Sequence, residues 1–84
     1  MNETCYICGR PACHHHHAFF GTANRRISDA WGFIVPLCWE HHEGPDGVHM
    51  DRELDLRIKR RLQEKFEETH TRQEFMQLIG RNYL

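Results

Sequence analysis

The sequence predicts a small α+β domain, with short strands and turns in its first half and helices in its last third. The strand signal is an apolar run at 33–35, bounded by a glycine and a proline. The helix signal is an apolar residue at every fourth position between residues 54 and 66. Cysteines recur at short gaps in the first half, and domains of this size often need such a staple to supplement a small core.

Composition limits the class of protein. The 84 residues are enough for one domain, which removes only about 60–65% of its unfolded surface from water. Hydrophobic residues make up 39% and charged residues 27%, values typical of globular chains rather than disordered ones. No apolar run approaches ~18 residues and the first residues do not resemble a signal peptide, so we expect a cytoplasmic protein without a membrane partner. The net charge of −1 means that any nucleic-acid contact must be a local patch.

Two pairs of metal-ligand residues lie about 30 positions apart. Cys5 and Cys8 are followed by a glycine that permits a tight turn, and Cys38 and His41 repeat the same two-residue gap. This spacing predicts a Cys3His zinc site, whose four protein ligands would make it structural. The alternative is a set of core cysteines without a metal. Cys13 is interpreted as a small buried residue or as a competing ligand.

Four consecutive histidines, His14 to His17, precede two aromatic residues and a glycine. Neutral imidazole binds divalent metals and can also accept a proton near neutral pH, so adjacent histidines can supply a ligand and a general base. A purification tag would lie at a terminus, whereas this run is internal. A polar turn remains the alternative interpretation of the run taken alone.

Two further histidines are candidates for the same region. Adjacent residues on a helix point about 100° apart, so His42 faces away from a metal bound by His41. The segment 44–47, Gly-Pro-Asp-Gly, predicts a turn that brings His49 back toward His42. The alternative is that His49 is a surface loop residue.

The segment 21–32 is predicted to begin as a loop, with a helical turn at 28–31. Asn24 can fix this loop through side-chain hydrogen bonds to the backbone. Arg25 and Arg26 can bind phosphate beside a metal site, although exposed arginines are more often solvated.

The last third predicts two helices. Asp51 is a candidate N-cap for the first, whose basic residues at 57–61 are interpreted as a solvated face or as phosphate contacts. Thr71 and Glu74 form a capping box for the second, which Gly80 ends. The two apolar stripes should pack on the first half, with Tyr83 and Leu84 closing the core.

Together these residues resemble the HNH endonucleases, the ββα-metal or His-Me finger group. The chain is similar to short phage and prophage members that join a C-x2-C knuckle to an HH-x-F-F-G segment, here residues 16–21, and to a C-x2-H-H turn at 38–42. The resemblance covers nearly the whole chain. It implies a single domain over 1–84, with a zinc-stapled ββα core at 1–50 and a helical tail at 51–84.

The resemblance also implies roles for individual residues. His16 and His17 would be the paired histidines, Asn24 the middle asparagine, and His42 and His49 the closing metal ligands. His14 and His15 extend the run beyond the family pattern, and the closing ligands lie seven residues apart rather than one helical turn.

The function that follows is hydrolysis of DNA phosphodiester bonds. One divalent ion such as Mg2+, Mn2+, Ni2+ or Zn2+, held by His16, His42 and His49, would stabilise the phosphoryl charge and the leaving group. His17 would take the proton from water, Asn24 would steady its loop, and partners would include DNA and phage replication, recombination or packaging proteins. The alternative is a non-catalytic zinc-ribbon-like nucleic-acid-binding module, which has no use for the extra imidazoles. A third interpretation is a metal-buffering or sensing protein.

Overall fold

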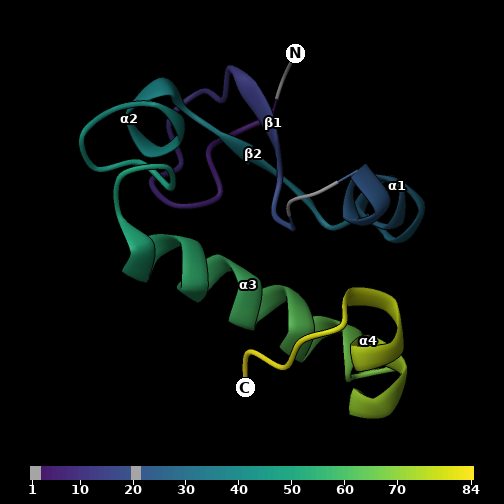
Figure 1. Ribbon diagram of the computed structural model, residues 1–84. Helices are drawn as coiled ribbons and strands as arrows, with labels where there is room; N and C mark the ends of the chain where they lie inside the picture. The colour runs from purple at the N-terminus through teal and green to yellow at the C-terminus, as the bar shows by residue number, and fades with distance from the viewer. Residues whose placement is uncertain (1–2, 20–21) are drawn as a thin grey trace.

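The computed structural model describes residues 3–19 and 22–84, with side chains from residue 25 onward in the second range. These ranges contain a two-stranded antiparallel sheet and four helices, which confirms the predicted small α+β class (Figure 1). The elements in chain order are β1 His14–His17, α1 Thr22–Trp31, β2 Ile34–Leu37, α2 Trp39–His42, α3 Arg52–Phe66 and α4 Arg72–Ile79. Figure 1 shows α1 and α2 at opposite ends of the sheet, with α3 running below it.

The register of the sheet separates the four histidines of β1 into two pairs. His14 lies opposite Leu37 and His16 opposite Val35, and residues directly opposite each other share one face of a sheet. Val35, Leu37 and His16 are buried, so this face is directed into the protein. Because successive side chains alternate, His15 and His17 point to the other face.

Helix α1 differs from the prediction. The segment was expected to be mainly loop, but the helix spans Thr22–Trp31. Among its described side chains, Ser28 is fully buried and Ile27 is half-buried, while most of the others are exposed. Ala23, Ile27, Ala30 and Trp31 recur at helical spacing, so the sequence carried an amphipathic helix signal and the prediction of a loop was wrong. Gly32 follows with a φ of 74°, a conformation that glycine adopts without a steric penalty.

The predicted strand at 33–35 begins one residue later and extends to Leu37. Pro36 lies inside it, which is compatible with an edge position because proline lacks a backbone donor. The Pro36 carbonyl accepts a hydrogen bond from the Tyr6 backbone N–H, at 2.8 Å. This bond attaches the turn at residues 5–9, here called the N-terminal knuckle, to the outer edge of β2.

Both C-terminal helices begin after the predicted caps, and the second ends at the predicted Gly80. The Asp51 side chain accepts a hydrogen bond from the Leu54 N–H, and the side chains spaced by four along α3 are buried. At α4, Thr71 and Glu74 form both bonds of the capping box, and Gly80 ends the helix with a φ of 82°. These are local signals, each set by a few adjacent residues.

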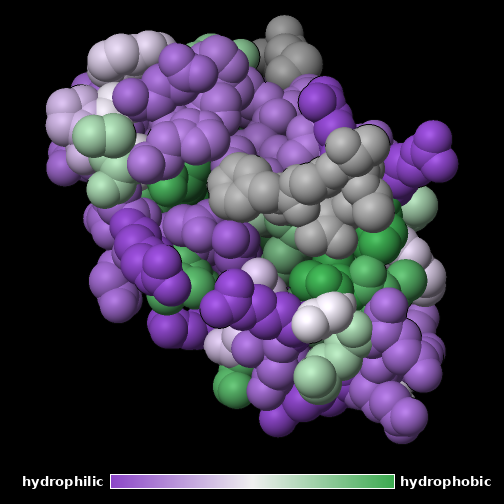
Figure 2. Space-filling view, in the orientation of Figure 1, coloured by the Kyte–Doolittle hydropathy of each residue, from purple (hydrophilic) through white to green (hydrophobic). Residues whose placement is uncertain are grey.

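The core joins the sheet to α3 and α4 through aromatic contacts. Phe19 lies edge-to-face against Phe33 and Phe75, with ring centroids 5.3 and 5.8 Å apart. Tyr83 packs against this core as expected, but Leu84 is 41% exposed, so its predicted core role was wrong. The C-terminal segment returns along α3, where the buried Gln63 accepts a hydrogen bond from the Tyr83 N–H at 2.8 Å. Figure 2 shows a surface that is mostly hydrophilic on this side, with hydrophobic residues visible between the sheet and the two C-terminal helices.

Candidate metal centres

The first candidate centre lies where the N-terminal knuckle meets the start of α2. Cys5, Cys8, Cys38 and His41 each place one ligand atom within 4.8 Å of all the others. The knuckle is closed by a hydrogen bond from the Gly9 N–H to the Cys5 carbonyl, and Gly9 has a φ of 77°. The structure therefore brings together the two pairs predicted from their spacing, and the cluster can hold a metal ion.

The distances within this cluster fit a tetrahedral ion. Zinc–sulfur bonds of about 2.3 Å place two thiolates about 3.8 Å apart at the corners of a tetrahedron. The Cys8 and Cys38 sulfurs are 3.7 Å apart. The His41 Nδ1 lies 3.3 Å from the Cys38 sulfur and 3.8 Å from the Cys5 sulfur, where about 3.5 Å is expected for a sulfur–nitrogen edge. Three sulfurs and one imidazole at these distances are compatible with zinc.

The surroundings of the cluster shift the pKa values of two of its thiols in opposite directions. Hydrogen bonds from the backbone and side chain of Arg10 lower the pKa of Cys8 to about 6, which favours the thiolate that a metal requires. Burial raises the pKa of Cys38. The Arg10 guanidinium also donates to Glu40 in α2 at 2.8 Å, and it lowers the pKa of that carboxyl. Arg10 thus connects the knuckle to the helix that supplies the other ligand pair.

Cys13 does not belong to this cluster. It is exposed, so the expectation that it would be a small buried residue was wrong. Its backbone N–H donates to the Leu37 carbonyl at 3.0 Å, which extends the pairing of the two strands by one residue.

The second candidate centre is formed by His16 of β1, His42 of α2 and His49 of the following turn. One nitrogen of each lies within 4.8 Å of the others, so this cluster can also hold a metal ion. The Val48 N–H donates to the His41 carbonyl and the Asp51 N–H to the Gly47 carbonyl, which folds the turn back over α2. The predicted return of His49 toward His42 is present.

The measured spacing in this cluster also suits a metal. Zinc–nitrogen bonds of 2.0–2.1 Å place two ligand nitrogens about 3.3 Å apart. The Nε2 atoms of His42 and His49 are 3.3 Å apart, and the ring of His16 lies edge-on to both, with centroids at 5.2 and 5.6 Å. Three nitrogen ligands leave room in a tetrahedral shell for a fourth, non-protein ligand. The Cys3His cluster has no such vacancy.

The surroundings of two of these imidazoles, His16 and His42, favour the neutral form. His16 is only 3% exposed, and burial, followed by the charges of His42 and His49, lowers its pKa to about 4. Burial also lowers the pKa of His42. A metal ligand must be unprotonated, so both side chains are in the form that can bind an ion at neutral pH.

His17 lies on the opposite face of β1 from His16. Its Nε2 is 2.9 Å from an Asp29 carboxylate oxygen in α1, and its side chain is 26% exposed. His15 makes the equivalent contact with Glu3, at 3.0 Å. The expected divergence of the two adjacent histidines is therefore present, with only His16 directed toward His42 and His49.

Three other predicted residues lie on α1. Asn24 is within the helix rather than in a loop, and its side chain is outside the part that the structure describes. Arg25 and Arg26 are exposed, and among the described side chains neither has an ion-pair partner. They are therefore available at the surface on the helix that also carries Asp29.

One residue near the histidines, Asp29, was not predicted from the sequence, and the upstream candidate His14 lies beside the cluster. Asp29 contacts His17 across twelve positions, and only the unexpected helix α1 brings it there. The ring of His14 lies 4.6 Å from that of His42, on the same face of β1 as His16. The alternation of β1 was the available signal for His14, since positions two apart share a face.

Nothing in the described part of the chain is a helix with the length and apolarity needed to cross a membrane. In comparisons with known proteins, no family model, curated protein or solved structure matches this chain.

Proposed function

We propose that the protein is a metal-dependent endonuclease of the HNH type that hydrolyses DNA phosphodiester bonds, with its two strands and adjoining helix forming a ββα-metal finger. The observation that carries this proposal is the cluster of His16, His42 and His49, which can hold an ion with an open coordination position. A proton acceptor, His17, lies next to it in the chain. A binding module would need neither feature.

The divalent ion, when bound by these three histidines, supplies positive charge to the phosphoryl oxygens and to the leaving oxygen. His17 has the separate task of taking a proton from water. An ionised carboxylate can only accept hydrogen bonds, so Asp29 requires the proton of His17 to be on Nε2. That leaves Nδ1 as the atom that receives the proton, and Asp29 stabilises the imidazolium that forms.

The Cys3His cluster has a structural role in this proposal. Zinc with four protein ligands has no position for substrate, and it would fasten the knuckle to α2. A reducing compartment such as the cytoplasm keeps these cysteines available as thiolates. Arg25 and Arg26 supply phosphate contacts on α1, the helix that also carries Asp29.

The test is nicking of supercoiled plasmid DNA with and without added Mg2+, Mn2+ or Ni2+. We expect His17→Ala to lower the rate by on the order of 10²–10⁴ with metal binding retained. His16→Ala should lose the metal. His15→Ala is the matched control, because it is a neighbouring exposed histidine of the same strand, also paired with a carboxylate.

The same assay distinguishes the nuclease from the alternative, a non-catalytic zinc-containing binding module. A non-catalytic zinc-containing module would bind DNA and release it intact under all metal conditions. If every variant from His14 to His17 behaves like wild type, the nuclease proposal is wrong.

A further inference from the structure

A second surface with ligand-binding character lies on the flank of α3 that faces the outer edge of β2. Arg57, Arg61 and Lys65 are spaced by four residues, so they form one stripe with about 6 Å of helix rise between neighbours. All three are exposed. Among the described side chains, none of the three takes part in an ion pair. In the described part of the chain, therefore, no carboxylate lies within ion-pair distance of these three cations.

The first part of this surface is a small polar hollow of about 180 Å3. Arg57 and Arg61 line one side, and Tyr6 and Ile7 of the knuckle line the other. Guanidinium groups converging on a concave site favour an anion such as phosphate. Because Tyr6 also borders the next hollow, the two adjoin.

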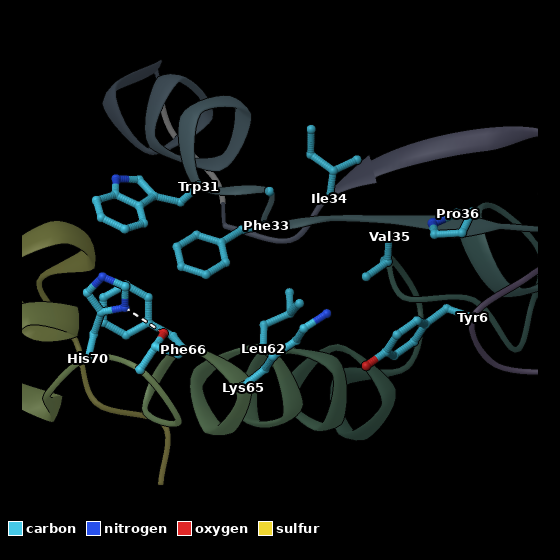
Figure 3. A pocket seen from close by; sticks show the side chains of 12 residues that line it. Tyr6, Trp31, Phe33, Ile34, Val35, Pro36, Leu62, Lys65, Phe66 and His70 are labelled. Atoms are coloured by element: carbon cyan, nitrogen blue, oxygen red, sulfur yellow. Dashed lines mark hydrogen bonds between the residues drawn. The ribbon is translucent and has the colours of Figure 1, made fainter.

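The second part is a larger hollow of about 490 Å3 between α3, the end of α1 and the edge of β2. Figure 3 shows the rings of Trp31, Phe66 and His70 at one end, and the Tyr6 ring at the other with its hydroxyl directed inward. The Trp31 ring lies edge-on to Phe66 and His70, at 5.6 and 5.2 Å, yet remains 44% exposed. Lys65 enters between the two ends (Figure 3).

We propose that this surface binds a single-stranded nucleic-acid segment, with phosphates on the stripe of Arg57, Arg61 and Lys65 and one base against Trp31. Charge complementarity selects a polyanion, because a row of cations follows the groove. The exposed indole selects a ligand with flat aromatic groups, since bases stack on such rings whatever their sequence. A base inside a duplex is already stacked and cannot enter the aromatic hollow, so the ligand must be single-stranded or locally unpaired.

The surface is separate from the histidine cluster. Successive helical positions turn by about 100°, so Lys59 lies about 160° around α3 from Arg57. Lys59 belongs to the other flank, where its ammonium lies 5.6 Å from the centre of the Tyr83 ring and its charge acts on His16. The inference rests on the proposed function in one respect, namely that the strand held here belongs to the DNA that is cleaved.

The experiment measures binding alone, by fluorescence anisotropy of a labelled oligothymidylate with zinc-loaded protein and no added divalent ion. We expect Trp31→Ala to weaken binding by ~10-fold or more, and Trp31→Phe to retain most of the affinity. Arg57→Ala and Arg61→Ala should each reduce the salt slope by about 0.7. Arg60→Ala is the matched control, because Arg60 is exposed on the same helix but lines neither hollow.

A blunt duplex of equal length and an oligo-aspartate competitor complete the design. The inference is overturned if Trp31→Ala binds the single strand as wild type does, or if the duplex binds equally well with the same dependence on Trp31. It is also overturned if oligo-aspartate competes fully and only the arginines matter, because the surface would then be an acidic-peptide site. If the protein binds the single strand but does not nick plasmid DNA, the nuclease proposal is wrong and this inference stands. If it nicks plasmid DNA but does not bind the single strand, this inference is wrong and the nuclease proposal stands.

Discussion

The two candidate metal-binding clusters of this small protein differ in how they are built. The Cys3His cluster joins two segments about 30 residues apart with four ligands, two of them buried cysteines. The histidine cluster has three ligands with graded burial, from the buried His16 to the exposed His49. A closed set of ligands suits a permanent staple, while an incomplete set that reaches the surface suits chemistry on an incoming molecule. We therefore expect the loss of a metal from the Cys3His cluster to unfold the protein, and the loss of a metal from the histidine cluster to affect its activity.

The largest expected effect is on the Cys3His cluster, whose loss should unfold the protein. Cys5→Ser should unfold the chain, because structural zinc contributes about 10 kcal/mol or more in small domains, comparable with their whole stability. Circular dichroism melts and zinc analysis of the purified protein measure this. Cys13→Ser is the control, since Cys13 is exposed and outside the cluster. A Cys5→Ser protein that melts like wild type would remove the distinction between the two centres.

The second prediction concerns the buried end of the histidine cluster. In protein without the second ion, the pKa of His16 is lowered to about 4, below its ordinary value of 6.5, so the unfolded chain binds more protons between these values. The contribution of neutral, buried His16 to the free energy of unfolding is therefore complete above about pH 6.5 and is lost as the pH falls toward 4. The loss is on the order of 3 kcal/mol. Zinc-loaded His16→Gln should show a flatter dependence in urea unfolding, while His15→Gln should follow wild type; equal slopes for wild type and His16→Gln would contradict the burial argument.

A third prediction separates the turn that carries His49 from the staple. A Cβ at Gly47 would lie 2.7 Å from the His42 carbonyl oxygen, so Gly47→Ala must displace backbone between these histidines. We expect about tenfold weaker binding of Ni2+ or Mn2+ at the histidine cluster, corresponding to ~1.4 kcal/mol, with zinc content unchanged. Calorimetric titration measures the binding of the added ion, and elemental analysis measures the zinc content. Pro45→Ala is the control in the same turn, where the residue is exposed; if Gly47→Ala binds the ion as wild type does, the turn does not position His49.

The features that were predictable from sequence are those set by neighbouring residues. Ligand gaps of two residues indicated both halves of the Cys3His cluster, and the caps at Asp51 and Thr71 marked the starts of α3 and α4. Each depends on a single turn of chain, for which the residue types and spacing suffice.

The features that were missed depend on distant segments meeting. Asp29 of α1 reaches His17, twelve positions away, only after β1 and α1 have packed. Helix α1 itself was missed for a different reason, because the glycines that flank it at 21 and 32 favoured a loop although Ile27, Ala30 and Trp31 have helical spacing. The link between Arg10 and Glu40 spans 30 positions in the same way. Cys13 was misassigned because burial depends on which side of the edge strand the chain passes, and composition carries no information on that.

The last prediction compares two similar contacts on the outer face of β1. His17 meets Asp29 at 2.9 Å and His15 meets Glu3 at 3.0 Å, each across twelve residues, yet only His17 is assigned a proton to move. Asp29→Asn keeps the shape of the side chain but removes the charge that stabilises an imidazolium. Because Asp29 is 60% exposed, water screens that charge, and we expect a loss on the order of fivefold in the rate of nicking at saturating metal. Asp29→Glu should restore part of the rate, and Glu3→Gln should leave it unchanged. If both amide variants slow the reaction equally, the two contacts only support the strand, and the proton acceptor must be sought among the other histidines.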